Sequence, residues 1–267
     1  MSKKIFIYRN NKTYSIETYN TLVSMLKERE YSIVNEYTPD IDLAFCIGGD
    51  GTFLSFMHKC QFPTAPIIGV NTGHLGFFQE ALPTELEKIL DAYETDNVTI
   101  QVIKPIKANI ITQRDSYTRI GINELLVRGP LSHTTHFSVL IDGTQVQEFS
   151  GDGILLSTPV GSTAYNYSLG GSLVAPDLDV IQLTPVAPMN TNAYRCFHSS
   201  VLLPSYKTVV FDKLDQNQGG SIILSFDGKT HEFSSVSKIE ISQAENELNL
   251  VRFHDYDYWK KLTTKLL

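Results

Sequence analysis

The chain has 267 residues, and 22 Lys and Arg against 29 Asp and Glu give a formal net charge of −7 at pH 7. With 42% hydrophobic and 19% charged residues, the composition is that of a folded chain and gives no case for disorder. The acidic balance argues against nucleic acids and anionic membranes as partners, since both bind basic surfaces.

Cysteine usage and the length of apolar runs indicate a cellular setting. The three cysteines, Cys46, Cys60 and Cys196, are widely spaced and form no CxxC pair, so neither a disulfide framework nor a zinc site is expected. No uninterrupted apolar run approaches the roughly 18 residues of a membrane span. We therefore expect a soluble, cytoplasmic protein with no metal site built from its own residues.

The first hundred residues alternate short apolar runs with helical periodicity. The predicted elements are a strand at Lys4–Tyr8, a helix at Ile16–Glu28, a strand at Leu43–Ile47, a helix at Phe53–Lys59, a strand at Pro66–Val70 and a helix opened by Pro83-Thr84. Such alternation predicts a Rossmann-like parallel α/β sheet, which binds ligands at the carboxyl ends of its strands.

From about Val98 the pattern changes to short β-like runs separated by turns. Asp142-Gly143 and Asp227-Gly228 are strong hairpin signals. The predicted strands are Val98–Val102, Ala108–Thr112, Ile120–Val127, His136–Ile141, Thr208–Phe211, Ile222–Phe226, Lys238–Ser242 and Leu248–Phe253. We expect an all-β sandwich. The predicted domains are residues 1–98 and 99–253, with a tail, 254–267, that packs back on the first domain. Trp259, the only Trp, is expected to anchor the tail against another surface.

A glycine-rich turn, Gly48-Gly49-Asp50-Gly51-Thr52, follows the second predicted strand. Asp-Gly is also a hairpin pair, so a purely structural turn is the alternative interpretation. The helical pattern that follows favours a strand-to-helix turn, where glycines let backbone N–H groups approach phosphate oxygens. Asp50 would there act as a general base or help to hold Mg²⁺.

Two further polar segments are candidates for ligand contact. Asn71-Thr72-Gly73-His74-Leu75-Gly76-Phe77 follows the next predicted strand and so lies at the same sheet edge as Asp50. His74, taken alone, is better explained as packing the loop, and no catalytic role is assigned to it. Asn123-Glu124 lies inside a predicted strand, where adjacent side chains face opposite sides. Ligand contact and an exposed edge-strand pair both explain this dipeptide.

The longest motif is residues 151–171, GDGILLSTPVGSTAYNYSLGG, which is too rich in Gly, Ser and Thr for a simple strand pair. Asp152 can accept hydrogen bonds from a ribose diol, and Ser162 or Thr163 can cap a short helix. Small residues leave room for an adenine-sized ring system beside Tyr165. The alternative, a structural Ser/Thr-rich loop, explains this density of turn and hydroxyl residues poorly.

These segments together carry a family resemblance. GGDGT resembles the nucleotide loop of a kinase superfamily that includes 6-phosphofructokinases, diacylglycerol and sphingosine kinases, and NAD kinases. NTGHLGF is similar to a signature that only the NAD kinases among these carry. GGDGT, NTGHLGF, NE and the long motif occur in the NAD kinase order, and the resemblance covers nearly the whole chain. Several NAD kinases carry a basic residue where this chain has Ser150, so no phosphate-contacting cation is carried over there.

The resemblance implies a phosphofructokinase/diacylglycerol-kinase type of α/β domain and transfer of the γ-phosphoryl group of ATP to the 2′-hydroxyl of the adenosine ribose of NAD. It implies Asp50 as the catalytic base, Mg²⁺ delivered with ATP, NAD and ATP as partners, and a homodimer or homotetramer. Asp227 lies either near the ligand or simply on its turn. The residues implied in substrate or nucleotide binding are Gly48, Gly49, Gly51, Thr52, Asn71, Gly73, His74, Phe77, Asn123, Glu124, Asp152, Thr158, Thr163, Ala164, Tyr165, Asn166, Ser168 and Ala187.

Two alternative functions follow from the same motifs. One is a lipid or sugar kinase of the superfamily, although a lipid kinase should show an apolar or basic membrane-facing patch, which this acidic chain does not suggest. The other is a non-catalytic NAD(H)-binding sensor on the same fold. The presence of Asp50 argues against the sensor.

Overall fold

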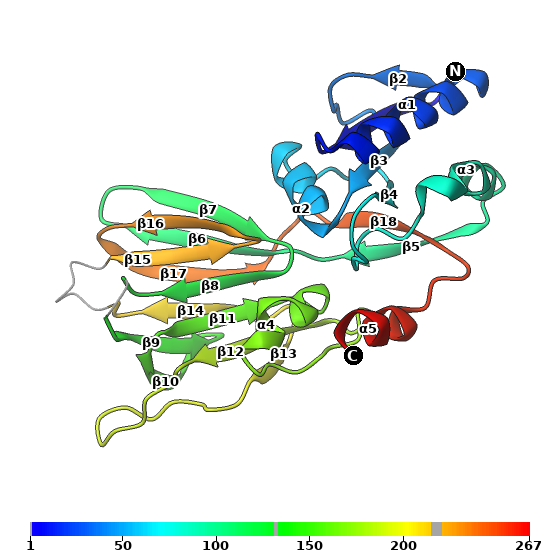
Figure 1. The fold of residues 1–267 in the computed structure, drawn as a ribbon. Coiled ribbons are helices and arrows are strands. Elements are labelled where there is room, and N and C mark those ends of the chain that lie inside the picture. Colours follow the sequence, from blue (N-terminus) through cyan, green and yellow to red (C-terminus); the bar gives the residue numbers. More distant parts are fainter. Residues whose placement is uncertain (1, 131–132, 215–220) are drawn as a thin grey trace. The chain divides into compact units, whose positions relative to one another are not determined.

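The computed structural model describes residues 2–130, 133–214 and 221–267 (Figure 1). The chain divides into two compact units. The first unit consists of Met1–Ile103 together with Asn246–Leu267, and the second unit of Lys104–Glu245. Because the chain leaves the first unit and returns to it, the second unit is an insertion into the first.

The first unit is built on a six-stranded sheet of order β2-β1-β3-β4-β18-β5 (Figure 1). The first five strands in this order, β2, β1, β3, β4 and β18, run parallel to one another, and β5 pairs with β18 antiparallel. β3 is buried along its whole length, as expected for a strand inside a sheet covered on both faces. The bounds are β1 Lys4–Arg9, β2 Ser32–Val34, β3 Leu43–Gly48, β4 Ile67–Asn71, β5 Val98–Ile103 and β18 Leu248–Phe253.

Helices cover both faces of this sheet. On one face, Leu22 and Leu26 of α1 (Thr13–Glu28) and Ile89 of α3 (Leu86–Glu94) pack in one core with alternate strand residues such as Phe45. On the other face, Phe56 of α2 (Asp50–Lys59) stacks on Tyr8, with ring centroids 5.1 Å apart. The unit also contains the short 3-10 helix Pro83–Glu85 and α5 (Tyr258–Leu266).

The second unit contains two antiparallel six-stranded sheets, of order β10-β9-β14-β17-β6-β7 and β13-β12-β11-β8-β15-β16. The first sheet consists of β6 Ile106–Thr112, β7 Ser116–Gly121, β9 Thr135–Ile141, β10 Thr144–Gly151, β14 Val209–Asp212 and β17 Val236–Gln243. The second consists of β8 Glu124–Arg128, β11 Gly153–Ser157, β12 Val180–Val186, β13 Val201–Pro204, β15 Ile222–Phe226 and β16 Lys229–Phe233.

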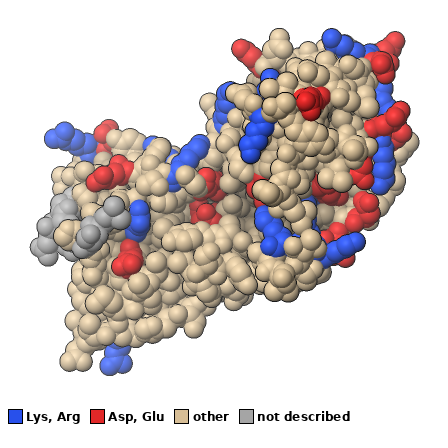
Figure 2. Space-filling view, viewed as in Figure 1, with Lys and Arg blue, Asp and Glu red and all other residues tan. Residues whose placement is uncertain are grey.

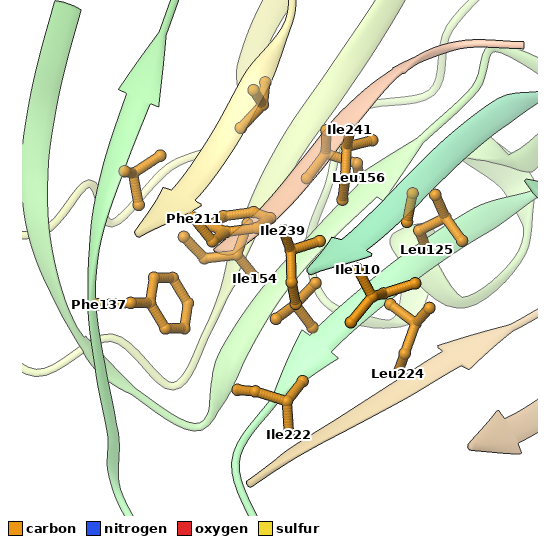
Figure 3. Packing of buried hydrophobic residues seen from close by; sticks show 14 of the residues in the cluster. Ile110, Leu125, Phe137, Ile154, Leu156, Phe211, Ile222, Leu224, Ile239 and Ile241 are labelled. Carbon is orange, nitrogen blue, oxygen red and sulfur yellow. The ribbon is translucent and has the colours of Figure 1, made fainter. Parts of the chain in front are cut away.

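One hydrophobic core lies between these two sheets. Figure 3 shows Phe137, Phe211 and Ile239 of the first sheet packed against side chains of the second, such as Ile154 and Leu224. All five side chains are at most 1% exposed. Alternate residues of both sheets therefore face a common interior, which makes the second unit a β sandwich. The predicted combination of an α/β domain and an all-β sandwich is confirmed.

The sheet assignment of two strands differs from the sequence-based domains. β5 and β18 lie in the sheet of the first unit, whereas residues 99–253 were assigned to the β-rich domain. The two strands pair with each other from Val98↔Phe253 to Ile103↔Leu248, and β18 joins β4. A short amphipathic or apolar strand has the same sequence pattern whichever sheet it joins, so its partner could not be inferred from that pattern.

A second difference concerns the predicted strand Ile120–Val127. It is two strands, because β7 ends at Gly121, β8 begins at Glu124, and the chain turns at Ile122-Asn123. The prediction that Asn123 and Glu124 are adjacent strand positions is therefore wrong. Both hairpin predictions agree with the structure, since Asp142 and Asp227 have φ of 46° and each is followed by a glycine of positive φ.

Among the described residues, no helix is both long and apolar enough to cross a membrane. On the face seen in Figure 2, the basic and acidic side chains of the first unit are interspersed. This mixture of signs is typical of a solvated surface.

Candidate active site

The glycine-rich turn of the first unit lies at the carboxyl end of β3. Gly48 pairs with Asn71 at the end of the neighbouring parallel strand β4, so both polar segments emerge at one edge of the sheet. Gly49 is the N-cap of α2, and Asp50 and Thr52 lie in the first turn of that helix. The predicted strand-to-helix turn is confirmed, and its open helix N-terminus is suited to an anionic group.

The Asp50 carboxylate is held by the second polar segment. Oδ2 accepts a hydrogen bond from the backbone N–H of Phe77 (3.0 Å), and Oδ1 accepts one from the N–H of Phe78 (3.1 Å). Oδ2 also accepts from Nζ of Lys265 on α5 at 2.8 Å. A Cβ on Gly76 would lie 2.2 Å from Oδ1, so only glycine lets the chain pass this close. The carboxylate is thus oriented before any ligand binds.

The loop after β4 is ordered by its own backbone. Asn71 is buried and its side chain accepts a hydrogen bond from the N–H of Gly73 (3.0 Å), while the N–H of Thr72 donates to the carbonyl of Gly48 (3.1 Å). Gly73 and His74 are exposed. The structure therefore leaves these two residues accessible and uses the amide of Asn71 to shape the turn.

A buried arginine that the sequence analysis did not identify holds the carbonyl groups of the same loop. Arg252 of β18 is 4% exposed and donates to the carbonyls of Phe77 (2.8 Å) and Phe78 (3.3 Å). It also pairs with Glu80 at 3.1 Å. Burial raises the pKa of Glu80, and the positive charge of Arg252 opposes this shift. The carbonyls of residues 77 and 78 are thus held by Arg252 while their N–H groups bind Asp50.

In the second unit, the Asn123 segment is fixed by Asp227. The Asp227 carboxylate accepts hydrogen bonds from the backbone N–H of Ile122 (2.8 Å) and of Asn123 (2.8 Å). The carbonyl of Asn123 in turn accepts the N–H of Thr158 (3.0 Å). A Cβ on Gly161 would lie 1.9 Å from this carbonyl oxygen. Asp227 therefore serves the turn between β7 and β8 as well as its own hairpin.

Glu124 is the buried acid of this unit. Its side chain is 9% exposed, and Oε2 has no hydrogen-bond partner among the described residues. Burial, and then the negative charge of Asp227, raise its pKa to about 7, while the backbone N–H of Tyr165 opposes the shift. An unpartnered buried carboxylate oxygen costs free energy, and a ligand hydroxyl would satisfy it.

The long motif folds into β11, the 3-10 helix Val160–Thr163 and the short helix α4 (Tyr165–Ser168). The predicted capping by Ser162 or Thr163 is wrong, because the N-cap of α4 is Ala164 and no side chain caps the helix. The Ser162 hydroxyl instead accepts the N–H of Val174 (3.0 Å). Ser162 is therefore used to hold the loop that follows.

Two candidate binding residues of this motif are used internally. Thr158 is 2% exposed, and its hydroxyl donates to the carbonyl of Ile122 (2.7 Å) and accepts the N–H of Gly161 (3.1 Å). Asn166 is fully buried, and its amide oxygen accepts the hydroxyl of Thr184 at 2.7 Å. Both side chains hold the loop in shape.

The other candidates of this unit are accessible. Asp152, Tyr165, Ser168 and Ala187 are exposed, and Thr163 and Ala164 are partly exposed. Ala187 has φ of 45°, an unusual backbone conformation for a non-glycine residue, directly after β12. Ser150, in the place of the family's basic residue, is 1% exposed and donates its backbone N–H to the sulfur of Cys196 (3.2 Å). Position 150 is thus part of the interior of the second unit.

These features define a class of protein. A parallel sheet with a carboxylate in a glycine-rich strand-to-helix turn, combined with a β sandwich that carries a hydroxyl-rich loop and a buried acid, is typical of an enzyme that handles nucleotide phosphates. Within the described residues, no group of three or more His, Cys, Asp and Glu side chains is arranged to hold a metal ion.

Comparison with known proteins identifies the family. The family model of the ATP-NAD kinase N-terminal domain matches residues 4–98, and that of the ATP-NAD kinase C-terminal domain matches residues 122–253. The chain belongs to the ATP-NAD kinase family. It is 35% identical over 270 residues to an NAD kinase of Finegoldia magna, covering 100% of this chain and 98% of the relative. It is 34% identical to an NAD kinase of Staphylococcus carnosus, covering 84% and 83%.

Solved structures share the fold. The crystal structure of yeast NADH kinase complexed with NADH matches with a TM-score of 0.83 and 20% identity, covering 98% of this chain and 86% of that chain. An NAD kinase from Archaeoglobus fulgidus in complex with ATP matches with a TM-score of 0.77 and 21% identity, covering 98% and 99%. The sequence-based assignment to NAD kinases is confirmed, and the lipid or sugar kinase and the sensor are not favoured.

Proposed function

We propose that this chain is an NAD kinase, which transfers the γ-phosphoryl group of ATP to the 2′-hydroxyl of the adenosine ribose of NAD and produces NADP. The observation that carries the proposal is the Asp50 carboxylate, which two backbone N–H groups hold at the carboxyl edge of β3 and β4. Relatives named NAD kinase that span this chain support the same activity.

Asp50 acts as the general base in this proposal. A ribose hydroxyl is a poor nucleophile at neutral pH, and a carboxylate beside it accepts its proton as the oxygen attacks the γ-phosphorus. Such a base typically contributes about 10²- to 10⁴-fold to the rate. The orientation of Asp50 by Phe77 and Phe78 supports this role, because a base held in place loses little freedom when the substrate arrives.

The remaining candidates divide by what they offer a ligand. Glu124 offers an unpartnered buried oxygen and Asp152 an exposed carboxylate, both suited to ribose hydroxyls. Tyr165 offers an exposed ring. Thr158 and Asn166 support the loop from within. The further binding residues that we propose are Gly48, Gly49, Gly51, Thr52, Asn71, Gly73, His74, Phe77, Asn123, Thr163, Ala164, Ser168 and Ala187.

Magnesium enters this scheme as part of the substrate. The described residues provide no cluster of three ligands, and the Asp50 carboxylate already accepts three donors. These observations do not fit a resident metal cage. We therefore assign Mg²⁺ to the MgATP complex, in keeping with the few protein ligands that this ion commonly has in kinases.

We also propose a cytoplasmic homodimer or homotetramer. The edge strands β7, β10, β13 and β16 of the sandwich offer backbone groups for pairing with a second copy. Light scattering of the purified protein measures the mass. A monomer at micromolar concentration would contradict this part of the proposal.

The activity and the base are tested with one set of proteins. Purified protein with NAD and MgATP should form NADP, detected with an NADP-specific dehydrogenase. Asp50→Asn should still bind NAD in calorimetry but lose at least about 10²-fold in kcat. Asp96→Asn, which removes an exposed carboxylate of the same unit at a position of φ 56° that Asn tolerates, serves as the matched control. Absence of NADP refutes the activity, and near-normal turnover by the Asp50 variant refutes the base.

A further inference from the structure

We propose that Lys265 of α5 positions the catalytic carboxylate and selects Oδ1 of Asp50 as the oxygen that receives the proton. This inference rests on the proposed role of Asp50 as base. It starts from the ion pair between Nζ of Lys265 and Oδ2 of Asp50, at 2.8 Å, which joins residues 215 positions apart. The side chains of Lys265 and Asp50 are only 29% and 26% exposed, so the pair is partly shielded from water.

The hydrogen bonds of the carboxylate are unevenly distributed. Oδ2 accepts two donors, the N–H of Phe77 and the ammonium of Lys265, whereas Oδ1 accepts only the N–H of Phe78. A carboxylate oxygen has two lone pairs. With Lys265 in place Oδ2 is therefore saturated, and Oδ1 retains the lone pair that can accept a hydroxyl proton.

The residue next to Oδ1 has no side chain. The chain passes this oxygen at Gly76, where a Cβ would lie 2.2 Å from Oδ1. A side chain at this position would collide with the oxygen that retains a free lone pair. Lys265 thus occupies one oxygen of Asp50, and the missing side chain of Gly76 avoids a collision with the other.

α5 is anchored on the segment that binds Asp50. Nζ of Lys261 donates to the carbonyl of Gln79 at 2.8 Å, and the ring of Tyr258 lies against the ring of Phe77, with centroids 6.1 Å apart. Nζ of Lys265 also lies 4.4 Å from the centre of the Phe77 ring. Three residues of one helix thus contact the segment 77–79, in which the N–H groups of Phe77 and Phe78 hold the carboxylate. This anchoring fixes the ammonium relative to Oδ2, as a positioning residue requires.

The test compares three substitutions in α5. Lys265→Met removes the ammonium and keeps the aliphatic stem, Lys265→Arg keeps the charge, and Lys260→Met is the control, since Lys260 is an exposed lysine of the same helix. We expect Lys265→Met to lower kcat by about 5- to 30-fold, less than the roughly 10²-fold cost of a 1 Å misplacement of a reacting group, because Phe77 and Phe78 still hold the carboxylate. The KM values for NAD and ATP and the thermal midpoint should stay near those of the control, and Lys265→Arg should recover most of kcat.

Combination with the Asp50 variant separates this inference from the proposed function. In the Asp50→Asn background, Lys265→Met should change kcat by less than about twofold, since no carboxylate remains to be positioned. If Asp50→Asn abolishes turnover while Lys265→Met leaves kcat unchanged, the positioning role is refuted and the base stands. A rise in kcat would identify Lys265 as an inhibitory contact instead, and a loss of thermal stability with no rescue by arginine would identify a purely structural role. Both outcomes overturn the inference.

Discussion

The buried acid of the sandwich predicts a pH-dependent stability. Burial raises the pKa of Glu124 in the folded chain to about 7, whereas the ordinary pKa of a glutamate is 4.5. Between pH 4.5 and 7 unfolding therefore releases a proton, so this residue makes unfolding more favourable as the pH rises through that window. The difference in pKa lowers the free energy of unfolding by about 3 kcal/mol above pH 7. About 1 kcal/mol of this destabilisation is already present at pH 5.

Glu124→Gln should remove this dependence, because the amide keeps the shape of the side chain and does not ionise. Relative to the unsubstituted protein, the variant should gain about 2 kcal/mol more in free energy of unfolding at pH 8 than at pH 5. Urea unfolding followed by far-UV circular dichroism at the two pH values measures this difference. Glu232→Gln, an exposed position on β16, is the matched control. If the gain is the same at both pH values, Glu124 is not held protonated in the folded protein.

Two further substitutions test the support of Asp50. Arg252→Met removes a buried cation that pairs with the mostly shielded Glu80 carboxylate, and it should lower the free energy of unfolding by about 3–5 kcal/mol in urea. Arg29→Met, in a more exposed ion pair, should cost about 1 kcal/mol or less. Equal costs would contradict the importance of the Arg252–Glu80 pair. Gly76→Ala should reduce kcat at least about 10-fold in the coupled assay, because its Cβ would displace Oδ1 of Asp50, and normal turnover would show that the carboxylate does not need this approach.

Local patterns in the sequence were sufficient for the elements and for the position of the glycine-rich turn. Alternating strands and helices led to the α/β unit, and Asp-Gly pairs located two hairpins of the sandwich. These features depend on residues close together in the chain. The turn at Ile122-Asn123 was missed because its stabilising carboxylate, Asp227, lies about a hundred residues away.

The parts of the site that sequence could not supply are all long-range. Arg252 contacts Phe78, 174 positions away in the sequence, and Lys265 contacts Asp50, 215 positions away. An isolated Arg or Lys in the sequence gives no indication of its partner. The sequence also could not show that Asn166 binds the carbonyl groups around it and not a ligand. An amide in a loop has the same sequence context in both cases. Tertiary packing alone decides between these roles.

The strand order of the first unit determines when its sheet can be completed during synthesis. β18 lies between β4 and β5, and β5 pairs with no other strand among the described residues. During synthesis β5 is made first but has no partner until the 142 residues of the second unit have followed and β18 has emerged. Until then β5 lacks its partner and β4 lacks the neighbour that pairs with it at Ile67, so the nascent first unit has unpaired strand edges that favour aggregation over that interval. A prematurely terminated chain ending at residue 245 would therefore be a substrate for chaperones or proteases.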